Sequence, residues 1–86
     1  MAWEVEGTRE FEEWYASLDG DDQDAVNQSI ERLEESGPSL SRPHADTVRE
    51  SKHANMKELR TQSKGRPLRT FFAFDPRRTA ILLLAG

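Results

Sequence analysis

The side chains best suited to chemistry in this sequence are cations in its second half. Arg60 and Arg69 stand out because they are expected inside strands, where a cation needs a packed salt bridge or an anionic ligand. Guanidinium groups bind phosphates through paired hydrogen bonds, so a nucleic-acid backbone is one candidate ligand. The plainer alternative is a structural role on a solvated sheet face. The other side chains expected to contact such a backbone are the cations Lys52, Lys57, Lys64, Arg66, Arg77 and Arg78, together with His53.

Strand geometry gives Arg69 an aromatic neighbour. Successive side chains of a strand point to opposite faces, so Arg69 and Phe71 share one face, while Thr70 and Phe72 share the other. If the second pair meets the helices, Arg69 lies on the open face beside Phe71. Cations next to exposed aromatic rings suit single-stranded nucleic acid, through phosphate contact and base stacking.

Two histidines are candidates for proton transfer. His44 and His53 have reference pKa values near neutrality and could serve as acid or base in RNA cleavage, although loop histidines are more often simply solvated. Neither has the spaced companions of a metal site. No phosphate loop, Cys/His pair or serine triad can be assembled, so no metal or other cofactor is expected.

Charge and composition narrow the class of protein. The chain has 86 residues, no cysteine and a net charge of −4, divided as −10 over residues 1–50 and +6 over residues 51–86. The split suggests a surface that faces a polyanion, or simply acidic helices beside a basic hairpin. The absence of cysteine fits a reducing cytoplasm. The longest apolar run, residues 80–85, is too short to cross a bilayer, and no membrane association is expected.

The element pattern predicts an α+β domain spanning residues 1–86. A first strand of edge type is expected at residues 3–7, followed by a helix capped by Thr8, and then a second helix capped by Asp21. The first helix carries its apolar stripe on Phe11, Trp14, Tyr15 and Leu18, and Gly37-Pro38 ends the second. The two are expected to form an antiparallel hairpin packed on an antiparallel sheet.

A three-stranded meander is expected at the end of the chain. Residues 38–54 are predicted to form a long loop with a short extended piece near Thr47-Val48. Strands follow at 55–62, 66–74 and 79–85, joined by turns at 63–65 and 75–78. The last two strands are apolar on both faces, so a further segment, a partner or a dimer mate is expected to cover the open side.

This order of elements is similar to the RelE/ParE toxin superfamily. The stretch MKELRTQSKGRPLRTFFAFDPRRTAILLLAG resembles the HigB-like branch, the phage-derived Gp49-like proteins, in its ELR strand and its LR…FAFDP strand. WEVEGTREFEEWYASL and SGPSLSRPHADTV resemble the same group. Members continue beyond the final glycine with a basic pair and a C-terminal segment that usually brings another catalytic cation. The resemblance therefore implies a single RelE/HigB-like domain without that segment.

The resemblance implies the toxin of a type II toxin–antitoxin system, a ribosome-dependent endoribonuclease that cuts messenger RNA and inhibits translation. By this likeness Arg69 and Arg60 are the catalytic candidates, and Lys57 is expected beside Arg60 as an RNA-backbone contact. The implied partners are a helix-turn-helix antitoxin, messenger RNA and the ribosome, with a homodimer or a heterotetramer with antitoxin as the assembly. Two alternatives stay open: a non-enzymatic toxin-fold module that binds the antitoxin and co-represses its operon, and a gyrase poison on the same fold.

Overall fold

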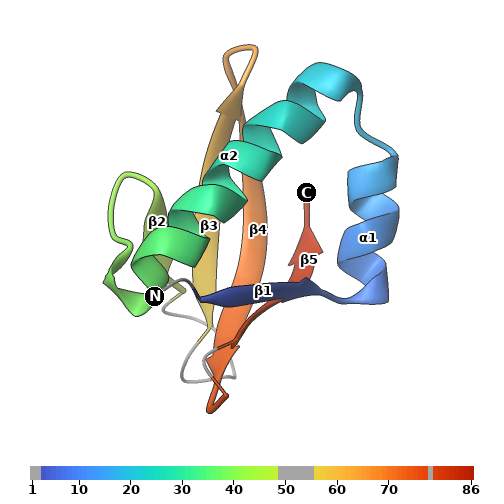
Figure 1. The fold of residues 1–86 in the computed structure, drawn as a ribbon. Coiled ribbons are helices and arrows are strands. Elements are labelled where there is room, and N and C mark those ends of the chain that lie inside the picture. Colours follow the sequence, from blue (N-terminus) through green and yellow to red (C-terminus); the bar gives the residue numbers. More distant parts are fainter. Residues whose placement is uncertain (1–2, 49–55, 78) are drawn as a thin grey trace.

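The structure, a computed structural model, describes residues 3–48, 56–77 and 79–86. It places both helices on one face of a five-stranded sheet whose strand order is β1-β5-β4-β3-β2 (Figure 1). The strands are β1 (Glu4–Gly7), β2 (Ala45–Thr47), β3 (Lys57–Ser63), β4 (Arg66–Asp75) and β5 (Thr79–Ala85). The helices are α1 (Arg9–Ala16) and α2 (Gly20–Ser36), and a 3-10 turn, η1, covers Gly37–Ser39. The predicted α+β architecture is confirmed.

The sheet is mixed rather than wholly antiparallel. Strands β2 to β5 pair antiparallel, and β3, β4 and β5 form the expected meander. At the other edge β1 runs parallel to β5, with Val5 opposite Ala80. The first strand is therefore an edge strand, as predicted, and it ties the start of the chain to its last strand.

Local sequence signals explain most element boundaries. The Thr8 hydroxyl accepts the Phe11 backbone N–H at 3.2 Å and so caps α1, as predicted. The cap of α2 is Asp19, whose carboxylate accepts the Asp22 N–H at 2.9 Å, so the prediction of Asp21 is wrong by two residues. Gly37 ends α2 at a φ of 54°, a conformation that L side chains rarely adopt.

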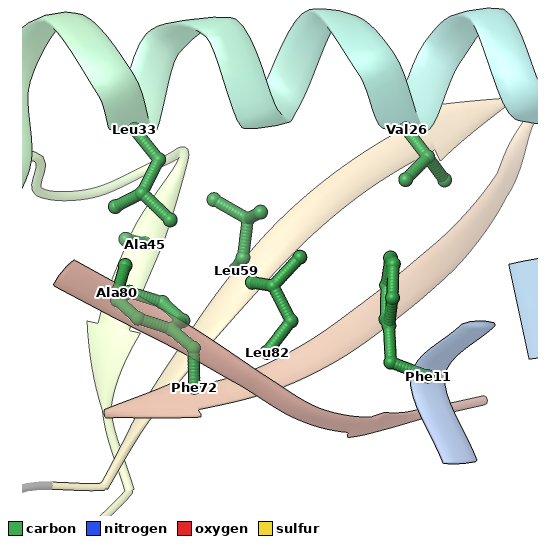
Figure 2. Packing of buried hydrophobic residues seen from close by; sticks show 8 residues of the cluster. All are labelled: Phe11, Val26, Leu33, Ala45, Leu59, Phe72, Ala80 and Leu82. Atoms are coloured by element: carbon green, nitrogen blue, oxygen red, sulfur yellow. The ribbon is translucent and has the colours of Figure 1, made fainter. Parts of the chain in front are cut away.

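The core lies between the two helices and the sheet (Figure 2). Helix α1 contributes Phe11, and α2 contributes Val26 and Leu33, which point toward the sheet. Thr70 and Phe72 are each 1% exposed on this side, which confirms that their set of β4 residues meets the helices. The remaining core side chains are Ala45, Leu59, Ala80 and Leu82.

A bulge in β5 changes which residues face the helices. Phe71 is opposite Leu84 and Phe72 is opposite Leu82, so Leu83 is an extra residue in β5. Leu82 points into the core, whereas Leu84 shares the open face with Phe71 and remains 52% exposed. Thr8 donates its hydroxyl to the carbonyl of Leu83, which joins the start of α1 to the bulge.

Candidate functional site

Two arginines lie opposite each other on the open face of the sheet, the face turned away from the helices. Arg60 of β3 pairs in register with Arg69 of β4, and both side chains are exposed. Their strand neighbours Leu59 and Thr70 are buried on the helix side, so side-chain alternation sends the arginines outward. The sequence-based placement of Arg69 on the open side is therefore confirmed.

Two carboxylates hold this pair of like charges together. Glu58 Oε1 lies 3.1 Å from Arg69 Nε and 3.7 Å from Arg60 Nε. Asp46 Oδ2 lies 3.4 Å from Arg60 Nη2 and 2.9 Å from Arg42 Nε. We call Asp46, Glu58, Arg60 and Arg69 the arginine cluster. Its members come from three adjacent strands, β2, β3 and β4.

The members of the cluster differ in how much they can offer a ligand. Arg60 is contacted at Nε by Glu58 and at Nη2 by Asp46, whereas Arg69 is contacted only at Nε among the described residues. The Arg69 side chain is 62% exposed and that of Arg60 is 44% exposed. Arg69 therefore has the freer guanidinium for an incoming anion.

The pKa of Asp46 reflects these contacts. The backbone N–H of Thr47 stabilises the charged carboxylate first, and Arg42 and Arg60 add to this, so the pKa of Asp46 lies below its usual value. The carboxylate is thus ionised throughout the physiological pH range and keeps its contact with Arg60.

An apolar strip continues the open face beyond Arg69. Phe71 lies two residues further along β4, and Ala73 pairs with Ile81 of β5. Leu84 lies opposite Phe71 and is exposed. We call Phe71, Ala73, Ile81 and Leu84 the apolar strip. Alternate residues of a strand are about 6.6 Å apart, so a phosphate at Arg69 and a base over Phe71 are compatible spacings.

The other predicted RNA contacts do not join the cluster. Lys57 is three residues from Arg60 in β3, so the two side chains point to opposite faces of the sheet. The Nζ atom of Lys57 lies 5.6 Å from the ring centre of Phe74 on the helix side. Its expected place beside Arg60 is therefore corrected.

The remaining predicted cations pair with carboxylates in the turns. Lys64 pairs with Asp19 and Arg66 with Asp22 at the β3–β4 hairpin tip, and Arg77 pairs with Asp75 in the opposite turn. Lys52, His53 and Arg78 lie outside the described residues.

His44 contributes through its backbone. Its carbonyl accepts the N–H of Arg60 at 2.8 Å, which continues the β2–β3 pairing by one residue. The residue also borders a hollow of about 320 Å³ between α2 and β3, which Arg32 and Gln62 line as well. His44 therefore lies next to Arg60 of β3 through its backbone and borders the hollow beside α2.

The part of the chain that the structure describes holds no group of three or more histidine, cysteine or acidic side chains suited to a metal ion. Within the same residues, no helix is both long enough and apolar enough to span a membrane.

Sequence reasoning missed the two acidic members of the cluster. Glu58 is two residues from Arg60, so strand alternation alone places both on one face. Asp46 could not be found this way, because only the pairing of β2 with β3 sets it opposite Glu58.

Comparison with solved structures defines the class of fold. The structure of a free E. coli toxin RelE variant with two arginine-to-alanine substitutions superposes with a TM-score of 0.75, at 10% identity, over 100% of this chain and 83% of that one. The toxin–antitoxin complex RelBE of E. coli gives 0.74 at 9% identity, over 99% of this chain and 95% of that one. The chain therefore has the RelE fold.

The chain belongs to the family described as phage-derived Gp49-like proteins, whose model matches residues 13–86. Two Mycobacterium tuberculosis H37Rv proteins are similar. A candidate toxin named HigB2 is 54% identical over 74 residues, which cover 85% of this chain and 37% of that protein. A candidate toxin named HigB3 is 47% identical over 77 residues, which cover 90% and 66%. The chain spans less than two thirds of either relative. The predicted resemblance to the HigB-like, RelE-type branch is confirmed.

Proposed function

We propose that this chain acts as the toxin of a type II toxin–antitoxin system and cuts messenger RNA on the translating ribosome. The observation that carries the proposal is the exposed Arg69 guanidinium beside Phe71 on the sheet face turned away from α1 and α2. Membership of a family whose relatives are named as candidate toxins supports it, as does the RelE fold. The place of action would be the cytoplasm, where ribosomes translate.

The proposed reaction is attack of a ribose 2′-hydroxyl oxygen on the adjacent phosphorus. The O2′–P bond forms while the P–O5′ bond breaks. The 2′-hydroxyl gives its proton to solvent water and the leaving 5′ oxygen takes one from water, which leaves a 2′,3′-cyclic phosphate and a 5′-hydroxyl. Negative charge grows on the phosphoryl oxygens in the transition state. The Arg69 guanidinium would neutralise it, as fixed cations do in other phosphoryl-transfer sites. Phe71 would hold a neighbouring base by stacking.

The partner proposed for this toxin is a helix-turn-helix antitoxin. A second candidate function follows from the same face: a non-enzymatic module that binds the antitoxin and helps to repress its operon. The apolar strip, with Leu84 52% exposed, favours a protein partner. The two carboxylates, which neutralise much of the arginine charge, favour it as well.

Induced expression separates the two candidates. An mRNA-cleaving toxin should arrest growth and create new in-frame mRNA 5′ ends, and Arg69→Ala should abolish both. Arg9→Ala is the matched control, because Arg9 is an exposed arginine of α1 paired with Glu13 on the helix side. Arrest that survives Arg69→Ala would contradict the assignment of Arg69. If the wild-type chain neither arrests growth nor cuts RNA, but binds the antitoxin encoded beside it, the module is the correct function.

A further inference from the structure

The carboxylate of Glu58 has an unusual place for an acidic side chain on an exposed sheet face. Its side chain is only 14% exposed, and it sits opposite both Asp46 and Phe71 in the strand register. Its Oε1 atom is buried and makes no hydrogen bond of good geometry within the described residues, although Arg69 Nε is 3.1 Å away. The contact with Arg69 is therefore a close charge contact with a buried oxygen.

In this structure the Oε1 atom of Glu58 is covered and is not within reach of a substrate hydroxyl. Oε1 is covered and lies against the Nε atoms of two arginines, so an incoming ribose would meet the guanidiniums rather than this atom. A general base must come within hydrogen-bond reach of the proton that it removes. The geometry of this oxygen instead suits it to act on the arginines.

We propose that Glu58 is a positioning residue that fixes Arg69 for contact with an RNA phosphate. Because Glu58 contacts Arg69 at Nε, the Nη groups of the largely exposed Arg69 side chain are left for paired hydrogen bonds to a phosphate. Arg60, contacted at both Nε and Nη2, is then part of the support rather than the phosphate ligand. This inference rests on the proposed RNA-binding function. It assigns different roles to two arginines that the sequence analysis names together as catalytic candidates.

Removing the charge of Glu58 gives opposite results under the two possible roles. If Glu58 only lowers the positive potential of the face, Glu58→Gln should bind RNA more tightly, because one negative charge beside the phosphate is gone. If Glu58 positions Arg69, the same change should weaken binding, because Arg69 becomes free to rotate. The direction of the change in affinity therefore decides between them.

The test is the affinity of the full chain for a short single-stranded RNA, measured by fluorescence anisotropy. Glu58→Gln should weaken binding about tenfold, which corresponds to about 1.4 kcal/mol. In an Arg69→Ala background, Glu58→Gln should cause no further loss, because the residue that it positions is absent. Glu13→Gln is the matched control: it removes the same charge from an exposed ion pair with Arg9 on α1, outside the arginine cluster, so RNA affinity should stay nearly equal.

A second measurement keeps the result independent of RNA cleavage and of folding. The Arg69 Nε–H resonance in the NMR spectrum should move and exchange faster with water in Glu58→Gln, while the Arg77 Nε–H signal, which reports the hydrogen bond to Asp75 in the far turn, stays unchanged. Tighter RNA binding by Glu58→Gln, or an unchanged Arg69 signal, would overturn the positioning role. Wild-type protein that shows the Arg69 signal but binds no RNA would instead contradict the proposed function and leave the contact itself established.

Discussion

Arg60 and Arg69 lie directly across from each other on adjacent strands, with one carboxylate oxygen of Glu58 within 3.7 Å of the Nε atom of each. Like charges in register on one sheet face destabilise a strand pair unless something compensates. Here Glu58 and Asp46 supply the compensation. The arrangement therefore brings two guanidiniums close together at a modest energetic cost and leaves one of them, Arg69, largely exposed.

The salt dependence of RNA binding should report how many cations meet phosphates. For single strands, the slope of log K against log salt is about −0.7 for each neutralised phosphate. Arg69→Ala should therefore make the slope less steep by about 0.7, while Arg77→Ala should leave it nearly unchanged, because Arg77 lies in the far turn and pairs with Asp75. Anisotropy titrations at several salt concentrations measure this, and equal slopes for wild type and Arg69→Ala would remove Arg69 from the phosphate contact.

Asp22 should be the most important charge for stability. It is 5% exposed, receives the Ser63 hydroxyl, and lies 2.9 Å from Arg66 Nη2, so it links α2 to the β3–β4 hairpin. Asp22→Asn should lower the free energy of unfolding by about 2 kcal/mol, as expected for a buried charged hydrogen-bond acceptor. Asp21→Asn, at an exposed neighbouring position, should change it by less than about 0.5 kcal/mol. Urea unfolding of both variants gives the comparison, and equal losses would refute this role.

The bulge in β5 predicts opposite behaviour for two leucines that are two residues apart. Leu82 is 1% exposed in the core, so Leu82→Ala should cost about 2–5 kcal/mol. Leu84 is 52% exposed, so Leu84→Ala should change stability by about 0.5 kcal/mol or less but weaken whatever binds the apolar strip. Urea midpoints check the first statement, and antitoxin or RNA affinity checks the second. A large stability loss in Leu84→Ala would mean that β5 continues without the bulge.

Acid should weaken the fold through three aspartates. Hydrogen bonding by Lys64 lowers the pKa of Asp19, the Thr47 N–H and then Arg42 lower that of Asp46, and Arg77 lowers that of Asp75. A carboxyl whose folded pKa is depressed stabilises the fold fully above its unfolded pKa, and this contribution is lost as the pH falls through the folded value. Stability should thus be flat from about pH 5 upward through neutrality and fall below about pH 4.

Side-chain carbon NMR of these aspartates during an acid titration measures the shifts directly. Midpoints below 3.8, the usual value, are expected for all three. High salt should reduce the shifts, because all three ion pairs are in contact with solvent. A midpoint at or above the usual value for Asp46 would indicate that its contact with Arg42 and Arg60 does not form in solution.

Short-range patterns predicted much of this molecule. The spacing of Phe11, Trp14 and Tyr15 gave the buried side of α1, and strand alternation put Arg69 on the open face beside Phe71. The same alternation puts Lys57 on the helix side. Its expected place beside Arg60 is wrong because residues three apart in a strand are near in sequence but point to opposite faces.

Features that depend on distant residues could not be predicted in this way. The parallel pairing of β1 with β5 joins residues more than seventy positions apart. The pairing of Asp46 with Glu58 requires β2 to pair with β3, which begins ten positions after β2 ends. The bulge at Leu83 leaves no local signal in an all-apolar run, since every register of that run looks equally favourable.

The Thr8 hydroxyl accepts from Phe11 at the start of α1 and donates to the carbonyl of Leu83 in the bulge, while the Thr8 backbone N–H donates to Leu82. Thr8 therefore links the first turn of α1 to β5 by hydrogen bonds. Straightening β5 would break the hydrogen bonds from Thr8 to Leu82 and Leu83 and unwind the beginning of α1 at the same time. A ligand that distorts β5 near the exposed Leu84 would therefore also change the conformation at the start of α1, on the helix side of the sheet.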